Sequence, residues 1–167
     1  KLIGLLIATI HFLNGDETAI SRYFDRNRER NGYKALNDGM LALAAGDGRL
    51  ALLRAKRAEK YLSNPAVTTL LIAQAAEAAG DTKRATEAYK TLLADDSTRF
   101  VALRGLMKQK LAEGDTDTAL KLAEKAFGMR PKHGETQDIL LRLQSEKSDW
   151  TGARATLGAK AKSGAIP

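Results

Sequence analysis

A Gly-Asp dipeptide recurs at a fixed interval along this chain, and no other feature restricts the possible folds as strongly. It occurs at Gly46-Asp47, Gly80-Asp81 and Gly114-Asp115, and Ser148-Asp149 stands at the fourth position. Each pair follows the previous one by 34 residues. A spacing this regular predicts a structural unit that is repeated along the chain.

The residues around each dipeptide predict a helix, a turn and a second helix. Glycine takes left-handed backbone angles without the steric penalty of a Cβ atom, so it can end the first helix. The aspartate can accept backbone N–H bonds at the start of the second. A 34-residue helix–turn–helix period is that of tetratricopeptide (TPR) repeats, so we predict an all-α, TPR-like solenoid wound into a right-handed superhelix. The alternative is a generic bundle of Ala-rich helices. Small residues that let two helix backbones approach follow the turns: Ala51, Ala85, Ala119 and Ala153.

Four repeats are predicted, over residues 33–64, 65–97, 98–131 and 132–167. Asn64 is expected to cap a helix that has Pro65 in its first position. Trp150 follows the fourth turn, where an aromatic ring can cover the junction of two helices. The helices are expected at 33–45 and 48–62, 65–79 and 82–94, 98–113 and 116–129, and 134–147 and 150–162.

An apolar stretch and then a basic one precede the repeats. Residues 2–13, LIGLLIATIHFL, are too few to span about 30 Å of hydrocarbon, which takes ~20 residues. Residues 1–13 are therefore either the end of a transmembrane or anchoring helix, or a core helix packed on the first repeat. The arginines of residues 14–32 favour the membrane and a juxtamembrane helix, because basic residues follow membrane segments on the cytoplasmic side. The alternative is a solvated helix held partly by the pairs Arg22–Asp25, Asp25–Arg28 and Arg26–Glu29.

The chain carries few residues that could do chemistry. It has no Cys, and its two histidines, His11 and His133, lie far apart without a neighbouring cluster of ligands. No Gly-rich phosphate loop follows a strand, and no serine has an adjacent base. We therefore expect a protein that is not an enzyme, with no catalytic residue, metal or cofactor. Haem ligation by His133 or Tyr33 is chemically possible, but such residues are more often structural.

The formal net charge of +7 could favour an acidic partner or an anionic membrane. It is also compatible with an ordinary solvated surface. Nucleic acid is disfavoured, because acidic residues alternate with the basic ones and no row of aromatic residues accompanies them.

Stacked TPR repeats present one side of each first helix along a concave groove. In the first two repeats this side is mostly apolar, and in the last two it is mostly charged. A partner segment could place apolar side chains at one end and acidic groups on Arg104, Lys108 and Arg142. The alternative is that these residues only pack on neighbouring chain or face solvent. The Lys/Asn clamp of chaperone-binding TPR domains does not match. The predicted protein-binding site is Tyr33, Leu36, Met40, Leu70, Gln74, Arg104, Lys108 and Arg142, with Val67, Val101, Glu135 and Asp138 on the same side.

Five stretches carry a family resemblance: GYKAL at 32–36, LALAAGD at 41–47, LLIAQAAEAAGD at 70–81, RFVALRGL at 99–106 and SDWTGARATL at 148–157. In this order they resemble the HemY N-terminal-domain family, bacterial inner-membrane TPR proteins associated with haem biosynthesis. The resemblance implies two N-terminal transmembrane helices, with residues 2–13 ending the second and the repeats facing the cytoplasm. It also implies a membrane-anchored scaffold for enzymes of late protoporphyrin and haem synthesis. Two alternatives stay open: a porphyrin-binding or porphyrin-handling protein, and an envelope assembly adaptor unrelated to tetrapyrroles.

Overall fold

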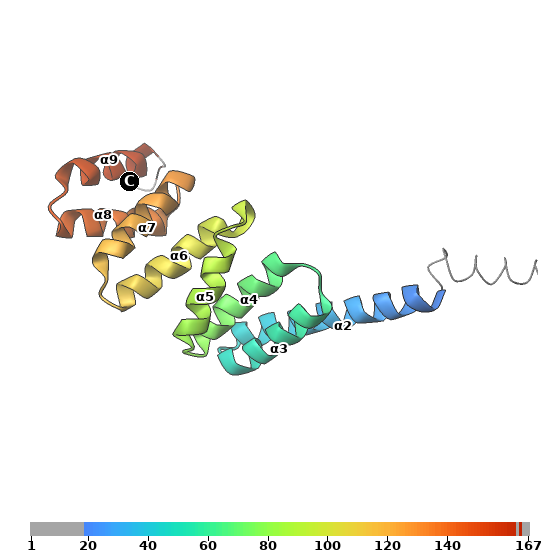
Figure 1. The fold of residues 1–167 in the computed structure, drawn as a ribbon. Coiled ribbons are helices and arrows are strands. Elements are labelled where there is room, and N and C mark those ends of the chain that lie inside the picture. The colour runs from blue at the N-terminus through green and yellow to red at the C-terminus, as the bar shows by residue number, and fades with distance from the viewer. Residues whose placement is uncertain (1–18, 163, 165–167) are drawn as a thin grey trace, which may run out of the picture.

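A computed structural model describes residues 19–162 and 164, with side chains described from residue 24. This part of the chain is helical and contains no strand, which confirms the predicted all-α class (Figure 1). The prediction for residues 1–13 lies outside the described residues. The helices are α2 (Ala19–Ala44), α3 (Gly48–Tyr61), α4 (Pro65–Ala78), α5 (Thr82–Leu92), α6 (Asp96–Ala112), α7 (Thr116–Met129), α8 (Gly134–Glu146) and α9 (Trp150–Lys162).

The turns between paired helices have the backbone geometry that the sequence predicts. Gly46, Gly80 and Gly114 have φ values of 80°, 77° and 78°, in the left-handed region where glycine carries no steric penalty. Each following aspartate accepts a backbone N–H bond near the start of the next helix, as a capping side chain does. These bonds run from Leu50 N to Asp47 (2.9 Å), Arg84 N to Asp81 (3.1 Å), Thr118 N to Asp115 (3.0 Å) and Gly152 N to Asp149 (3.0 Å).

Ser148 at the fourth turn has a φ of 57° and is the only non-glycine residue with a positive φ in the described part of the chain. A left-handed conformation costs an L-residue roughly 1–2 kcal/mol. Replacing Ser148 with Gly removes that strain, although the greater freedom of Gly in the unfolded chain offsets part of the gain. We expect Ser148→Gly to raise the free energy of unfolding by about 1 kcal/mol, measured by urea denaturation. Ser148→Ala keeps a Cβ atom and is expected to give no gain; equal gains from both variants would contradict the explanation.

The helices stack in chain order and do not surround a single centre. Each helix contacts the next one along the chain, and α2 also contacts α4. Figure 1 shows the resulting row, with α2 at one end and α9 at the other. One apolar cluster joins α3 to α6 and another joins α6 to α8. The alanines after the turns lie in this interior, because Ala51, Ala85 and Ala119 have no exposed surface.

The first helix differs from the prediction. A boundary was expected near residue 33, but α2 runs without a break from Ala19 to Ala44. No proline interrupts this stretch of sequence. Gly32 does not end the helix; it allows α2 to approach Leu62 closely, because a Cβ atom at Gly32 would lie 2.6 Å from Leu62 Cδ2. The basic segment from residue 19 and the first helix of the repeats are therefore one helix. No described helix has the length and apolar character needed to cross a membrane.

Three smaller expectations also change. Trp150 is 67% exposed, so it does not cover a helix junction. The helix expected from residue 98 begins at Asp96, because the side chain of Asp95 caps it by accepting from Ser97 N at 2.8 Å. Among the described side chains of α2, neither Asp25–Arg28 nor Arg26–Glu29 forms an ion pair within 4.0 Å; the side chain of Arg22 lies outside that description.

Candidate partner-binding groove

The apolar half of the predicted groove contains both open and core-facing side chains. Tyr33 and Met40 of α2 are 56% and 57% exposed, and Val67 in the first turn of α4 is 41% exposed. Leu36 and Leu70 are half-buried against the core cluster that joins α3 to α6. Tyr33, Met40 and Val67 are therefore available to another molecule, whereas Leu36 and Leu70 mainly hold α2 and α4 in place.

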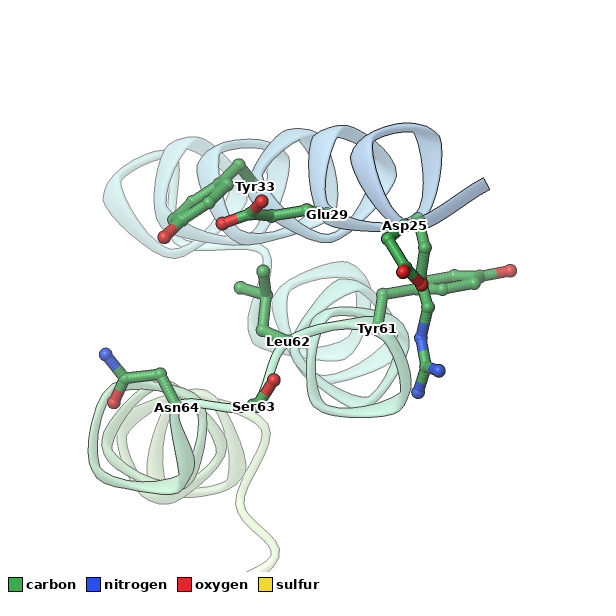
Figure 2. Close-up of a pocket in the computed structure, with 8 residues that line it drawn as sticks. Asp25, Glu29, Tyr33, Tyr61, Leu62, Ser63 and Asn64 are labelled. Atoms are coloured by element: carbon green, nitrogen blue, oxygen red, sulfur yellow. The ribbon is translucent and has the colours of Figure 1, made fainter. Parts of the chain in front are cut away.

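A hollow of about 430 Å³ lies beside Tyr33, where α2 passes the connection between α3 and α4. Figure 2 shows Glu29 and Tyr33 on α2, facing Leu62 and Asn64 of the connection. Arg28 fixes the edge of this hollow by donating to the backbone oxygen of Lys60 at 3.3 Å. The surroundings of Tyr33 are thus more polar than its place in an apolar row suggested.

A second hollow, of about 170 Å³, lies between α4 and α6 and is floored by Tyr89 of α5. The Tyr89 side chain is 3% exposed, and its hydroxyl donates to Glu77 Oε2 at 2.8 Å. Burial raises the pKa of this phenol, and the hydrogen bond to Glu77 raises it further, so Tyr89 stays a neutral donor. The ring lies against Gly105, where a Cβ atom would be 2.4 Å from Tyr89 Cζ. The wall of this hollow is completed by Gln74, Val101, Arg104 and Lys108.

The charged half of the groove holds an internal ion cluster. Lys108 Nζ lies 2.6 Å from Glu135 Oε1, and Arg104 pairs with Glu135 Oε2. The hydrogen bond from Lys108 holds the pKa of Glu135 below its usual range, and Arg104 adds to this effect while desolvation opposes it. Two cations from α6 thus share one carboxylate from α8, which leaves one positive charge uncompensated. The Nε atom of Arg104 is buried and has no partner among the described residues.

Arg142 does not join this cluster. It pairs weakly with Glu146 of its own helix, with Nε and Oε1 3.8 Å apart. Asp138, on the same predicted side of α8, pairs with Lys160 of α9. The cations at the charged half therefore form the Arg104–Lys108 pair and a separate Arg142.

A third hollow, of about 340 Å³, continues along α6 beyond Lys108. It reaches Gln109, which is 7% exposed and accepts from Thr86 Oγ1 at 2.7 Å. The buried Nε2 atom of Gln109 has no partner in the described part of the chain. Sequence reasoning missed Glu77, Tyr89, Gly105 and Gln109; the usable sign was a glycine in mid-helix, which often marks a close approach.

His133 is used to cap α8. Its Nδ1 accepts from Thr136 N at 3.3 Å, and its ring stands edge-on to Phe100 with centroids 5.0 Å apart. Arg130 lies over the same Phe100 ring, 4.4 Å from its centroid. This position gives His133 a structural role. Over the residues that the structure covers, no group of three or more His, Cys, Asp or Glu could hold a metal ion.

The comparison with protein families bears on the first half of the chain. Residues 2–80 match the family model described as HemY protein N-terminus. The chain is therefore similar to this family over these residues. The HemY match confirms the family resemblance within residues 2–80, whereas the stretches at 99–106 and 148–157 lie beyond the matched residues. None of the curated proteins matches the chain.

The HemY match divides the predicted groove. It includes the apolar half, with Tyr33, Met40 and Gln74 on α2 and α4, and it ends before α5. The ion cluster of Arg104, Lys108 and Glu135 lies beyond the matched residues.

Proposed function

We propose that this protein is a non-catalytic scaffold that binds a segment of a partner protein along the predicted groove. One observation carries the proposal: the row of exposed apolar side chains, Tyr33, Met40 and Val67, leads toward two cations that share one carboxylate. The apolar row can hold apolar side chains of a partner segment, and the two cations can attract its acidic side chains. A partner carboxylate would take the place of Glu135 on Arg104 and Lys108.

The architecture proposed for this scaffold is a TPR solenoid of four repeats in a right-handed superhelix. It is supported by the four helix pairs, by the positive φ at each turn and by the capping aspartates. In such a solenoid each repeat packs only on its neighbours, so one side of every first helix stays open to a ligand.

The proposed location is the bacterial inner membrane, with the repeats facing the cytoplasm. The proposed partners are enzymes of late protoporphyrin and haem synthesis. The HemY match supports both statements, because it joins a membrane-associated family to this pathway. Residues 1–13 would provide the anchor.

The experiment has two steps, partner capture and affinity measurement. A photo-crosslinking residue at Met40 is expected to capture a partner in the native membrane, whereas one at the exposed Glu124 of α7 is not. The partner is then purified and its affinity measured. Arg104→Gln with Lys108→Gln is expected to raise Kd about tenfold, because both charge-assisted contacts are lost.

The matched control is Lys121→Gln with Lys125→Gln on α7, which removes two exposed cations at the same spacing. We expect it to change Kd less than twofold. Glu135→Gln should act in the opposite direction and lower Kd, because it removes the internal competitor. Equal capture from Met40 and Glu124, or equal Kd values for the two double variants, would overturn the proposal.

A further inference from the structure

The α2–α3 hairpin has a second exposed face that the groove does not use. Lys34 and Asp38 of α2 line a hollow of about 200 Å³ together with Arg54 and Arg57 of α3. We call this the basic hollow. None of its three cations forms an ion pair within 4.0 Å with a described residue, and its single acid leaves a local charge of about +2. Three cations held around a single carboxylate leave an excess of positive charge, so the arrangement favours an anionic ligand.

Exposed leucines continue this face toward the turn. Leu41, Leu50 and Leu53 are 62%, 38% and 65% exposed. Residues three, four or seven positions apart lie on the same side of a helix. One side of α3 therefore carries Leu50, Leu53, Arg54 and Arg57, and one side of α2 carries Lys34, Asp38 and Leu41.

The two helices run antiparallel through the turn at 45–47, which places the leucines at one end and the cations beyond them. The two helices come close together beside the basic hollow, because a Cβ atom on Gly39 of α2 would lie 3.2 Å from Arg54 Cβ of α3. Phe24, 63% exposed, lies two heptads before Asp38 and extends the same side of α2.

This face is separate from the groove and from the stacking surface. Leu36 and Leu43 of α2 pack toward the core clusters, and Tyr33 and Met40 face the groove. Figure 1 shows α2 and α3 at one end of the row of helices, so no later helix of the row covers their outer side. The hairpin thus presents leucines and unpaired cations side by side on a surface about two helices wide.

We propose that this face binds an anionic membrane surface. Lipid phosphates enter the basic hollow, where the guanidinium groups of Arg54 and Arg57 can each donate two hydrogen bonds. Leu41 and Leu53 insert into the boundary between headgroups and acyl chains, as apolar residues of interfacial helices do. The hairpin then lies flat on the membrane, and the groove of the same hairpin stays open on another side.

Charge and family both favour a membrane over a second copy of the chain. A symmetric dimer through this face would bring the cations of two basic hollows together, and like charges at an interface oppose association. The residues that match the HemY family include the whole hairpin, and the family is membrane-associated. This inference does not depend on the groove, so either proposal can fail without the other.

Vesicle binding of the whole chain tests the proposal. The protein is mixed with phosphatidylcholine vesicles or with vesicles of phosphatidylcholine and phosphatidylglycerol (7:3) at 0.1 M salt, and the ratio of the two partition coefficients is measured. Any apolar contribution, including that of residues 2–13, is common to both vesicle types, so the ratio isolates the anionic contribution. Lys34→Gln, Arg54→Gln and Arg57→Gln together are expected to lower this ratio about tenfold, since each cation near an anionic surface adds to binding.

The matched control removes three cations from another side of α3, with Arg49→Gln, Lys56→Gln and Lys60→Gln. We expect this control to lower the ratio of partition coefficients less than twofold, because these cations lie outside the basic hollow. If only the total charge of the protein mattered, both triple variants would lower the ratio equally. Equal loss for the two variants, or a wild-type ratio near one, would overturn the proposal.

A spectroscopic test locates the contact directly. The chain has no Cys, so one introduced cysteine can carry an environment-sensitive fluorophore. A label at Leu53→Cys is expected to shift its emission to the blue on phosphatidylglycerol-containing vesicles, whereas a label at Met40→Cys in the groove is not. A shift at Met40 without one at Leu53 would mean that a different face meets the membrane, and the proposal would be wrong.

Discussion

Replacing Gly48 with Ala is expected to lower the free energy of unfolding by about 3 kcal/mol, a large effect for one added methyl group. Gly48 is the buried first residue of α3 and lies against the end of α4. A Cβ atom there would be 2.4 Å from the carbonyl carbon of Ala78, 2.4 Å from the nitrogen of Ala79 and 2.7 Å from the oxygen of Ala78. These are backbone atoms, so no side-chain rotation can relieve the overlap, and α3 must move away from α4.

Gly128→Ala is the matched control for this prediction. Gly128 also lies in a helix, α7, but it is exposed, and a Cβ atom there would meet nothing within 4 Å. The same change is therefore expected to stabilise the protein by roughly 0.5–1 kcal/mol, because Ala has the higher helix propensity. Urea denaturation of both variants measures the difference. Similar effects of the two substitutions would mean that α3 and α4 are not in backbone contact at Gly48.

Gly48 also shows where sequence reasoning stops. The dipeptide before it predicted the turn, because the requirements of a left-handed glycine and a capping aspartate are local. The corresponding residues after the other turns are Thr82, Thr116 and Trp150. Nothing in the one-dimensional pattern marks Gly48 as a contact with α4, because that contact depends on how two helix pairs stack.

Helix bounds were predictable for the same local reason. The helix expected at 48–62 is observed as Gly48–Tyr61, and the one expected at 134–147 as Gly134–Glu146. The continuous α2 was missed, since a long basic segment and a repeat helix look separate in composition but share an unbroken helical backbone. A capping residue in the sequence indicates where a helix starts, whereas no particular residue indicates that one helix continues into the next predicted segment.

The candidate groove was predictable in its direction but not in its contacts. The repeat pattern placed Arg104 and Lys108 on the same side of α6, and both line the hollow beside Tyr89. It did not predict that they share Glu135, because this contact depends on how α6 and α8 stack, and Arg104 lies 31 positions before Glu135 in the sequence. Leu36 and Leu70 were assigned to the groove by position, although the core cluster takes most of their surface.

Replacing Gly105 with Ala is the second substitution with a large expected effect. A Cβ atom on Gly105 would lie 2.4, 2.5 and 2.6 Å from three atoms of the Tyr89 ring. That ring is 3% exposed and is held by the bond from its hydroxyl to Glu77, so it has little room to move. We expect a loss of about 2 kcal/mol in the free energy of unfolding, after the higher helix propensity of Ala has offset part of a larger clash.

A double-mutant cycle identifies the ring as the cause. In a Tyr89→Leu background the new methyl group has space. The decrease in the free energy of unfolding caused by Gly105→Ala should therefore be smaller than in the wild type, by about 1 kcal/mol or more. In a Tyr89→Phe background the ring remains and only the hydroxyl is gone, so the loss should persist. An equal loss in all three backgrounds would show that the backbone of α6, and not Tyr89, resists the added methyl group. Because Tyr89 floors the hollow beside Arg104 and Lys108, a ring displaced by Gly105→Ala would also narrow the proposed partner site, and the Tyr89→Leu background would reopen it.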